Sequence, residues 1–322
     1  MSGIKKVLVT DYVFPNLDPE KAIIGAAGGE VIFAGKDADD AKILELAKDA
    51  DAILNCYKKI PAELYSTASK CKLIVRYGIG TDTIDIPEAT KHHIAVSNMP
   101  DYCIDEVSDH ALTLILSSIR KITTANKLIK SGTWSLGPLK PIRRLKTLTL
   151  GLHGFGRIPR MVAEKAKSFG FKIIACDPYI SNELADKMGV QSVSFDELCA
   201  MSDVISIHAP LTKETSEIFN SEAFAKMKDG IVIVNTARGG LIKEADLVEA
   251  LKSGKVGAAG LDVTNPEPPA KNNPLFDFDN VTFTPHEAWY SEEALVELQN
   301  KAAGEIVRSL KGEPLKYQLN KL

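Results

Sequence analysis

Short apolar runs alternate with polar, helix-like segments through the first hundred residues of this 322-residue chain. The runs have the length of single strands, and segments between them, such as 37–50, carry apolar residues at helical spacing. The pattern predicts strands over residues 5–11, 30–35, 51–56, 72–77 and 94–99. Strands that alternate with helices form βαβ units, so this part of the chain predicts a parallel sheet.

A second alternating series begins near residue 147. It predicts strands over residues 147–154, 171–177, 202–209, 230–237, 256–263 and 280–286. Helical segments separate most of these strands, which indicates a second parallel sheet of at least six strands. A further amphipathic helix is predicted over residues 291–312. The chain is therefore expected to belong to the α/β class, with two sheets.

Residues 104–132, between the two series, read as one long helical stretch. Its apolar positions include Val107, Ala111, Leu114, Ile115, Ile119, Ile122 and Ile129. This density exceeds what one side of a surface helix needs. Two interpretations carry equal weight: the helix packs in the core of its own chain, or it packs between domains or against a second subunit.

Composition narrows the classes of function. The chain is 45% hydrophobic and 25% charged with a net charge of -3, as in a soluble globular protein. It shows neither a membrane-length apolar run nor a secretory leader, so a cytoplasmic protein with no membrane partner is expected. The one short basic run, 141–146, gives little support for a nucleic-acid partner. The scattered cysteines predict neither disulfides nor a metal site.

Residues 148–179 contain most of a dinucleotide-binding turn. Gly154 and Gly156 follow a predicted strand, and the helix after them would offer its N–H groups to a pyrophosphate. Asp177 ends the next strand, where a carboxylate binds ribose hydroxyls and repels a 2′-phosphate, so NAD is favoured over NADP. A lone GxG pair is equally typical of a structural turn; the strand, the helix and Asp177 favour the cofactor.

Pro159 stands where the third glycine of G-x-G-x-x-G belongs. Proline fits the first helical turn, because the N–H it lacks has no partner within the helix there. The expected losses are close packing of the helix on the strand and one donor near the phosphates.

Three further strands each lead to a chemically capable residue: Arg238, Glu267 and His286. Parallel topology brings such strand ends to one edge of the sheet. Together they suit the reduction of a 2-keto acid: arginine binds a carboxylate, and histidine donates a proton while a carboxylate orients it and favours its charged form. Singly, each has a plainer interpretation, as a surface ion pair, a loop carboxylate or a buried histidine. The segment 286–290 lacks the second histidine of a zinc motif.

Four motifs in order, "GFGRI", "NTARGGLI", "LDVTNPEPP" and "TPHEAWYSEEA", resemble the NAD-dependent D-isomer-specific 2-hydroxyacid dehydrogenases. The resemblance covers essentially the whole chain. Within that family, "VRYGIG" and "HEAWYS" are similar to the branch that includes the C-terminal binding proteins, NAD(H)-binding transcriptional corepressors.

The resemblance implies a Rossmann-type doubly wound parallel sheet with a smaller, flavodoxin-like α/β substrate domain. The substrate domain would comprise residues 1–100 and 290–322, and the NAD domain residues 101–289, with catalysis in the cleft between them. It also implies a homodimer formed through the region 104–132.

Site residues follow from the resemblance by position. Arg238, Glu267 and His286 would be catalytic. Residues implied at the cofactor, besides Gly154, Gly156 and Asp177, are Arg157, Ile158, Ala209, Pro210, Thr215, Thr236, Ala237 and Asp262, the last on the nicotinamide amide. Residues implied at the substrate are Arg76, Gly78, Ile79, Gly80 and Trp289. His153 departs from the aliphatic residue usual in the family and is expected to be tolerated at the strand end.

Two hypotheses on function result. The favoured one is an enzyme that interconverts a small 2-keto acid and its D-2-hydroxy acid with NAD(H). The alternative is a regulatory protein that senses NADH, which the resemblance to the corepressors motivates and the lack of long disordered or basic tails opposes. The sequence leaves the identity of the acid open, although no second phosphate-binding cluster is evident, which disfavours phosphoglycerate.

Overall fold

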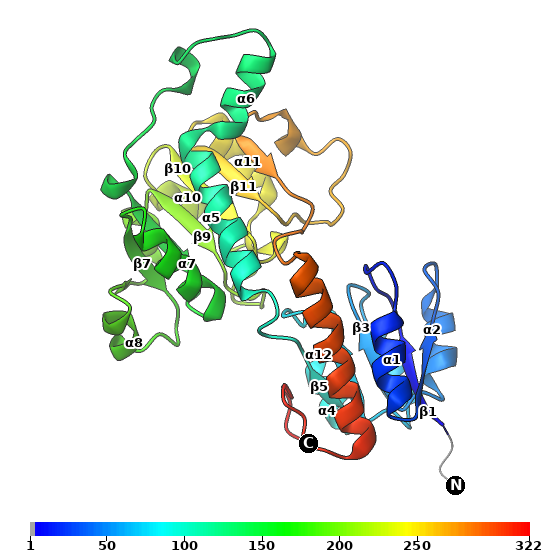
Figure 1. Cartoon of the computed structure of the whole chain (residues 1–322). Helices are drawn as coiled ribbons and strands as arrows, with labels where there is room; N and C mark the ends of the chain where they lie inside the picture. Colours follow the sequence, from blue (N-terminus) through cyan, green and yellow to red (C-terminus); the bar gives the residue numbers. More distant parts are fainter. Residues whose placement is uncertain (1–3) are drawn as a thin grey trace. The chain divides into compact units, whose positions relative to one another are not determined.

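The computed structural model describes residues 4–322, which form two compact units (Figure 1). Unit 1 contains the chain up to Cys103 together with Ser291–Leu322. Unit 2 contains Ile104–Tyr290 and is therefore inserted into unit 1 along the sequence.

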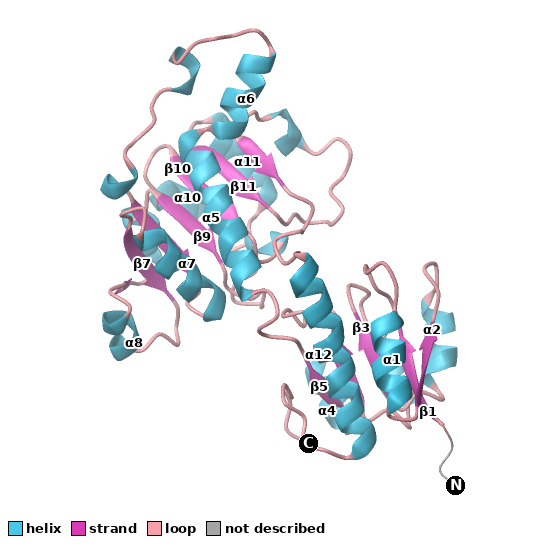
Figure 2. Cartoon of the chain, in the orientation of Figure 1, coloured by secondary structure: helices cyan, strands magenta, loops and turns pink. Residues whose placement is uncertain are grey.

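Unit 1 is built on a five-stranded parallel sheet (Figure 2). Its strands are β1 (Lys5–Val9), β2 (Gly29–Phe33), β3 (Ala52–Asn55), β4 (Leu73–Arg76) and β5 (Ala95–Ser97), in the order β2-β1-β3-β4-β5. This order is that of flavodoxin, so the predicted fold class is confirmed. The helices of the unit are α1 (Asp18–Ala26), α2 (Asp40–Ala47), α3 (Ala62–Thr67), α4 (Ile86–Lys91) and α12 (Glu292–Lys311).

Unit 2 is built on a seven-stranded parallel sheet in the order β12-β11-β10-β9-β6-β7-β8. The strands are β6 (Thr149–His153), β7 (Lys172–Cys176), β8 (Gln191–Ser192), β9 (Val204–Ile207), β10 (Ile231–Asn235), β11 (Val256–Leu261) and β12 (Val281–Phe283). Six of them fall within the predicted runs. The edge strand β8 does not, because its two exposed polar residues carry no apolar pattern.

Helices cover both faces of this sheet. They are α5 (Ile104–Arg120), α6 (Ile122–Lys130), α7 (Arg157–Lys167), α8 (Asn182–Lys187), α9 (Phe195–Met201), α10 (Ser221–Lys226) and α11 (Glu244–Lys252), with short 3-10 turns at Gly137–Leu139, Leu145–Thr147, Gly239–Leu241 and Pro274–Asp277. Two apolar cores result, one on each face.

The stretch predicted as one helix over 104–132 is two helices. Lys121 adopts a left-handed conformation with φ of 55°, which ends α5 and starts α6. The apolar residues of α5, including Leu114 and Ile115, are buried in the core of unit 2, which confirms packing within one chain for this part. In α6, by contrast, Ile122 and Ile129 remain exposed.

None of the helices described between residues 4 and 322 has the length and apolar character that crossing a bilayer requires.

Candidate active site

The strand order of unit 2 gathers the predicted residues along one edge of the sheet. The order reverses between β6 and β9, which are neighbours although β7 and β8 separate them in sequence. Ligands of open parallel sheets bind outside the carboxyl ends of the strands at such a reversal. At this edge lie Gly154 after β6 and Ala209 after β9, while His286 follows β12 at the far end of the row.

The glycine turn after β6 meets two separate steric demands. Gly154 has φ of 97°, and a Cβ there would lie 2.9 Å from the backbone nitrogen of Ala209. Gly156 has φ of -71°, and a Cβ there would meet no atom within 4 Å. The packing of the protein itself thus requires glycine at position 154, because any side chain there would collide with the backbone of Ala209. The space beside Gly156 is open, as close approach of a pyrophosphate requires.

Pro159 is the third residue of α7, which starts at Arg157. The first four N–H groups of a helix have no partner within it, so proline removes no helical hydrogen bond here. The Pro159 ring is buried, whereas Arg157 and Gly156 are exposed and Ile158 is half-buried. The predicted acceptance of proline in the first turn is therefore confirmed for the fold.

Asp177 directly follows β7 and is tied to the glycine turn. Its Oδ2 accepts a hydrogen bond from the backbone N–H of Phe155 at 2.6 Å, and its Oδ1 accepts from that of Tyr179 at 2.7 Å. The carboxylate is therefore held beside the turn by backbone donors. Its predicted contact with the ribose hydroxyls stays a prediction.

The loops after β9 and β10 lie along the same carboxyl edge of the sheet as the glycine turn. Thr215 donates its hydroxyl to the carbonyl of Pro210 at 2.7 Å, which closes the loop after Ala209. The hydroxyl oxygen of Thr236, just after β10 and before Ala237, is buried without a hydrogen-bond partner among the described residues. A buried hydroxyl without a hydrogen bond is unfavourable, and a bound ligand can supply the missing partner. Together with the open space at Gly156, it fits a bound dinucleotide.

His286 and Glu267 form a direct pair at the other end of the edge. The Nδ1 atom of His286 lies 2.7 Å from Oε2 of Glu267, and the second carboxylate oxygen accepts the N–H of Thr264 at 3.1 Å. His286 has φ of 55°, a conformation that costs energy for a residue with a side chain. Such strain is concentrated at functional sites. Both side chains are partly exposed, so a small molecule can reach them.

The charge of Arg238 also acts on this pair. Burial by itself raises the pKa of Glu267, but the hydrogen bond and charge of His286, the Thr264 N–H and the charge of Arg238 together lower it below its ordinary value. Gly239 allows the approach, because a Cβ there would lie 2.0 Å from the carbonyl oxygen of Thr264. The three predicted catalytic residues are thus brought together, and their roles stay proposals.

Asp262 is buried beneath the His286 segment. Its carboxylate accepts from the Thr284 hydroxyl at 2.6 Å and from the backbone N–H groups of Glu287 and Ala288, both at 3.0 Å. His110 of α5 lies 2.9 Å from the same Thr284 hydroxyl. Asp262 therefore fixes the backbone around His286. The implied contact of Asp262 with nicotinamide remains a prediction.

Sequence reasoning missed His110 and Thr284 as supports of this segment. His110 is one polar position on an amphipathic helix, and its partner is distant in sequence. The only available signal was the position of Thr284 two residues before His286.

His153 is the last residue of β6 and is buried with 6% of its surface exposed. Its ring contacts Phe195 and Phe219 edge-on, at centroid distances of 5.5 and 5.1 Å, and its Nδ1 has no partner among the described residues. Burial lowers the pKa of His153 to about 4, although the charge of Asp177 acts in the opposite direction. The strand end thus holds a neutral imidazole on the face of the sheet that packs with α9 and α10.

The residues implied at the substrate carboxylate lie in unit 1, in the loop after β4. Gly78 has φ of 131°, and the guanidinium of Arg76 folds over it. Asn98 donates its side-chain amide to the carbonyl of Ile79 at 2.6 Å, and Met99 donates its N–H to the carbonyl of Gly78 at 2.9 Å. The loop is therefore anchored through the carbonyl groups of Gly78 and Ile79, and the N–H of Gly78 is itself donated to the carbonyl of Arg76 at 2.9 Å.

Arg76 itself is 6% exposed, and its Nε has no acceptor among the described residues. In unit 2, Trp289 is half-buried and its ring contacts that of Tyr290 edge-on at a centroid distance of 5.5 Å.

No group of three metal-ligating side chains occurs within residues 4–322.

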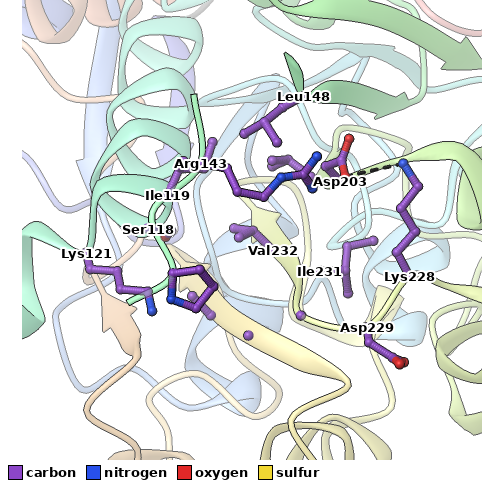
Figure 3. Close-up of a pocket in the computed structure, with 15 residues that line it drawn as sticks. Ser118, Ile119, Lys121, Arg143, Leu148, Asp203, Lys228, Asp229, Ile231 and Val232 are labelled. Atoms are coloured by element: carbon purple, nitrogen blue, oxygen red, sulfur yellow. Dashed lines mark hydrogen bonds and ion pairs between the residues drawn. The ribbon is translucent and has the colours of Figure 1, made fainter. Parts of the chain in front are cut away.

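Figure 3 shows a pocket of about 160 Å³ at the opposite edge of the larger sheet, where β9, β10 and β11 begin. Three of its charged groups lie together: Asp203 accepts from Arg143 at 2.6 Å and lies 3.3 Å from the ammonium of Lys228. None of the predicted site residues lines it. The pocket is therefore separate from the candidate active site.

Most of unit 2 matches a known protein family. Residues 112–288 match the model of the D-isomer specific 2-hydroxyacid dehydrogenase, NAD binding domain. The chain is 41% identical over 278 residues to a D-3-phosphoglycerate dehydrogenase of Archaeoglobus fulgidus, a match that covers 86% of this chain and 53% of that protein. The chain thus spans about half the length of the curated relatives it matches.

Solved structures match over nearly the whole chain. A glyoxylate reductase from Paecilomyes thermophila superposes with a TM-score of 0.89 and 32% identity, covering 99% of both chains. A D-lactate dehydrogenase from Aquifex aeolicus, complexed with NAD and lactic acid, gives a TM-score of 0.87 and 30% identity, covering 95% of this chain and 96% of that one. The matched domain binds NAD, as predicted, and the chain belongs to the D-isomer specific 2-hydroxyacid dehydrogenase family.

Proposed function

We propose that this protein is an NAD-dependent dehydrogenase that interconverts a small 2-keto acid and its D-2-hydroxy acid. The observation that carries the proposal is the 2.7 Å pair between His286 and Glu267, beside Arg238, at the edge of the sheet that holds the glycine turn. The names of the relatives, which include phosphoglycerate and lactate dehydrogenases and a glyoxylate reductase, support this class of substrate.

NAD would be held by the turn around Gly156, by Asp177 and by the row of residues after β9 and β10. When bound, its nicotinamide ring accepts or supplies the hydride. The open space at Gly156 and the unpaired hydroxyl of Thr236 are the features that fit it. Asp177 would select NAD, because a fixed carboxylate repels a 2′-phosphate.

His286 would transfer the proton. Glu267 engages Nδ1, so we assign proton transfer to the other ring nitrogen, Nε2. The ionised carboxylate orients the ring and stabilises the positive charge that the ring carries before it donates to the developing alkoxide. In the oxidation direction the neutral ring accepts the hydroxyl proton.

Arg238 would bind the substrate carboxylate or carbonyl through its guanidinium. In unit 1, the N–H groups of Ile79 and Gly80 would bind the substrate carboxylate, since that of Gly78 is donated to the Arg76 carbonyl at 2.9 Å, and Arg76 would line the substrate pocket. Trp289 would contribute to the substrate pocket. These assignments rest on position and on the resemblance.

A homodimer belongs to the same proposal. Four large apolar side chains of the segment 122–136 are exposed: Ile122 at 56%, Ile129 at 46%, Trp134 at 89% and Leu136 at 60%. Figure 1 shows α6 and the following loop standing clear of the sheet of unit 2. Exposed apolar groups of this density mark interaction surfaces. Sedimentation of the wild type and of Trp134→Ser would test whether they join two copies.

The deciding experiment is a panel of 2-keto acids with NADH, run on the wild type and on His286→Gln. We expect turnover by the wild type and a loss of about 10² to 10⁴-fold in kcat in the variant, with NADH binding retained. Equal turnover by both proteins would exclude the acid–base role. Tight NADH binding with no turnover of any acid would instead favour a sensor.

A further inference from the structure

A glutamate with no exposed surface links three segments of unit 1. Glu20 of α1 accepts a hydrogen bond from the hydroxyl of Tyr77 at 2.9 Å, and its Oε2 accepts from the side-chain amide of Gln299 in α12, also at 2.9 Å. The Gln299 amide donates in addition to the carbonyl of Asn16, just before α1, at 3.0 Å. Tyr77 directly follows β4, so the cluster joins α1, α12 and the end of that strand.

The donors to Glu20 are uncharged, and burying its carboxylate is unfavourable by itself. Burial raises the pKa of Glu20, while the hydrogen bonds from its own N–H, from Tyr77 and from Gln299 act in the opposite direction. Apolar side chains of similar volume would fill this space without burying a charge. A fully bonded polar network, unlike an apolar contact, specifies one arrangement of its members. The cluster therefore holds Tyr77 in one orientation, beyond filling the core.

The backbone and the side chain of Tyr77 are fixed separately. Its N–H donates to the carbonyl of Asn55 in β3 at 2.8 Å. Its buried ring contacts Phe14 edge-on at a centroid distance of 4.9 Å, and the hydroxyl at the far end of the ring binds Glu20. The residue thus spans from the sheet to helix α1.

The loop that we assign to the substrate carboxylate begins at the residue after Tyr77. Its first N–H, that of Gly78, is donated within the chain at 2.9 Å, and Gly78 has φ of 131°. The N–H groups of Ile79 and Gly80 have no acceptor among the described residues, so they are the donors that remain for a ligand. Because the backbone that carries these two donors leaves from Tyr77, a tilt of Tyr77 would redirect both.

We propose that Glu20 is a positioning residue: through the Tyr77 hydroxyl it orients the remaining N–H groups of the following loop toward the substrate carboxylate. The inference rests on the proposed function. Glu20 itself would touch neither substrate nor cofactor, because it has no exposed surface. Its contribution is preorganisation, since donors that already point at a carboxylate need no rearrangement when the substrate binds.

The first test removes the hydroxyl. In Tyr77→Phe the ring remains, but the loop loses its anchor, and misplaced donors bind the carboxylate less well. We expect KM for glyoxylate or pyruvate, whichever the wild type reduces, to rise about 10-fold, while the dissociation constant of NADH stays within about twofold. A purely structural role would lower the folded fraction, and with it kcat, without changing KM.

An unchanged KM in Tyr77→Phe would overturn the inference and leave the dehydrogenase intact. No reduction of any 2-keto acid by the wild type would instead remove the proposed function, and this inference with it.

The matched control is Tyr65→Phe. Tyr65 is also buried in unit 1, and its hydroxyl accepts the N–H of Asp85 at 2.7 Å, at the start of α4 and outside the loop. This change also removes one buried hydrogen bond, so it should lower stability toward urea without raising KM. An equal rise in KM in both variants would refute a specific role of Tyr77.

A double variant, Glu20→Leu with Tyr77→Phe, separates orientation from packing. It removes the buried carboxylate together with the hydroxyl, so no charge stays buried without its donor, and stability toward urea should equal or exceed that of Tyr77→Phe. KM should nevertheless stay about 10-fold above that of the wild type, because nothing holds the ring in its direction. Recovery of the wild-type KM would show that the cluster serves packing alone. If Tyr77→Phe does not fold, the double variant decides.

Discussion

Replacing His153 by isoleucine should remove a pH-dependent loss of stability. Burial among Phe195 and Phe219 lowers the pKa of the imidazole to about 4, from about 6.5 for an unfolded histidine. Between these values the unfolded chain binds a proton that the folded chain does not. The stability contribution is therefore complete above the unfolded pKa and is lost as the pH falls from about 6.5 toward 4.

The magnitude follows from linkage. With these two pKa values, one such histidine lowers the free energy of unfolding by about 2 kcal/mol between pH 7 and pH 5. Burial, the larger cause, also lowers the pKa of His208, to about 3, and the charge of His153 lowers it further; the effect of burial is present in both proteins and cancels in the comparison. At pH 7 the variant should be at least as stable as the wild type, because it loses an unpaired buried nitrogen.

Tryptophan fluorescence, recorded during urea unfolding, measures the free energy of unfolding at each pH. It reports on the right unit, because both tryptophans, Trp134 and Trp289, lie in unit 2 with His153. The variant should gain about 2 kcal/mol relative to the wild type on going from pH 7 to pH 5. His93→Asn is the control: His93 is exposed, and its φ of 54° is one that asparagine tolerates. Parallel stability curves for His153→Ile and the wild type would refute the reasoning.

The remaining predictions concern the site. Gly154→Ala should destabilise unit 2 by about 2 kcal/mol or more, since its Cβ would meet backbone at 2.9 Å, whereas Gly156→Ala should leave stability within about 1 kcal/mol and weaken NADH binding at least tenfold. Urea unfolding and NADH titration separate the two effects, and equal destabilisation by both changes would contradict the assignment. Asp177→Ser should narrow the preference for NAD over NADP in kcat/KM; a wild type faster with NADPH would contradict the carboxylate argument. Glu267→Gln should lower kcat about 10² to 10³-fold, because it removes the carboxylate that orients His286, and unchanged kcat would show that the pair is structural.

The sequence predicted those features that depend on local pattern and topology. Strands such as β6 and β10 are apolar runs of the right length, and parallel order then brings Arg238, Glu267 and His286 to one edge without further information. Features that depend on a single dihedral or on a distant partner were not predictable. The break at Lys121 is one backbone angle, and nothing near residue 110 indicates that its imidazole meets Thr284.

The position of His153 shows the same limit. The sequence identified it as unusual and placed it at a strand end, but whether such a ring is solvated or enclosed depends on which side chains pack over the strand. Phe195 and Phe219 come from segments distant in sequence, so the enclosure could only be seen in three dimensions.

The discontinuity of unit 1 has a consequence for how the protein is made. Helix α12 completes this unit through contacts such as the hydrogen bond from Gln299 to the buried Glu20 of α1, at 2.9 Å. A ribosome synthesises α1 early and α12 only after the whole of unit 2. Unit 2, which is continuous, can acquire its structure while it emerges. The nascent first hundred residues must wait for a helix that does not yet exist, and during that interval chaperones would encounter their uncovered apolar surface.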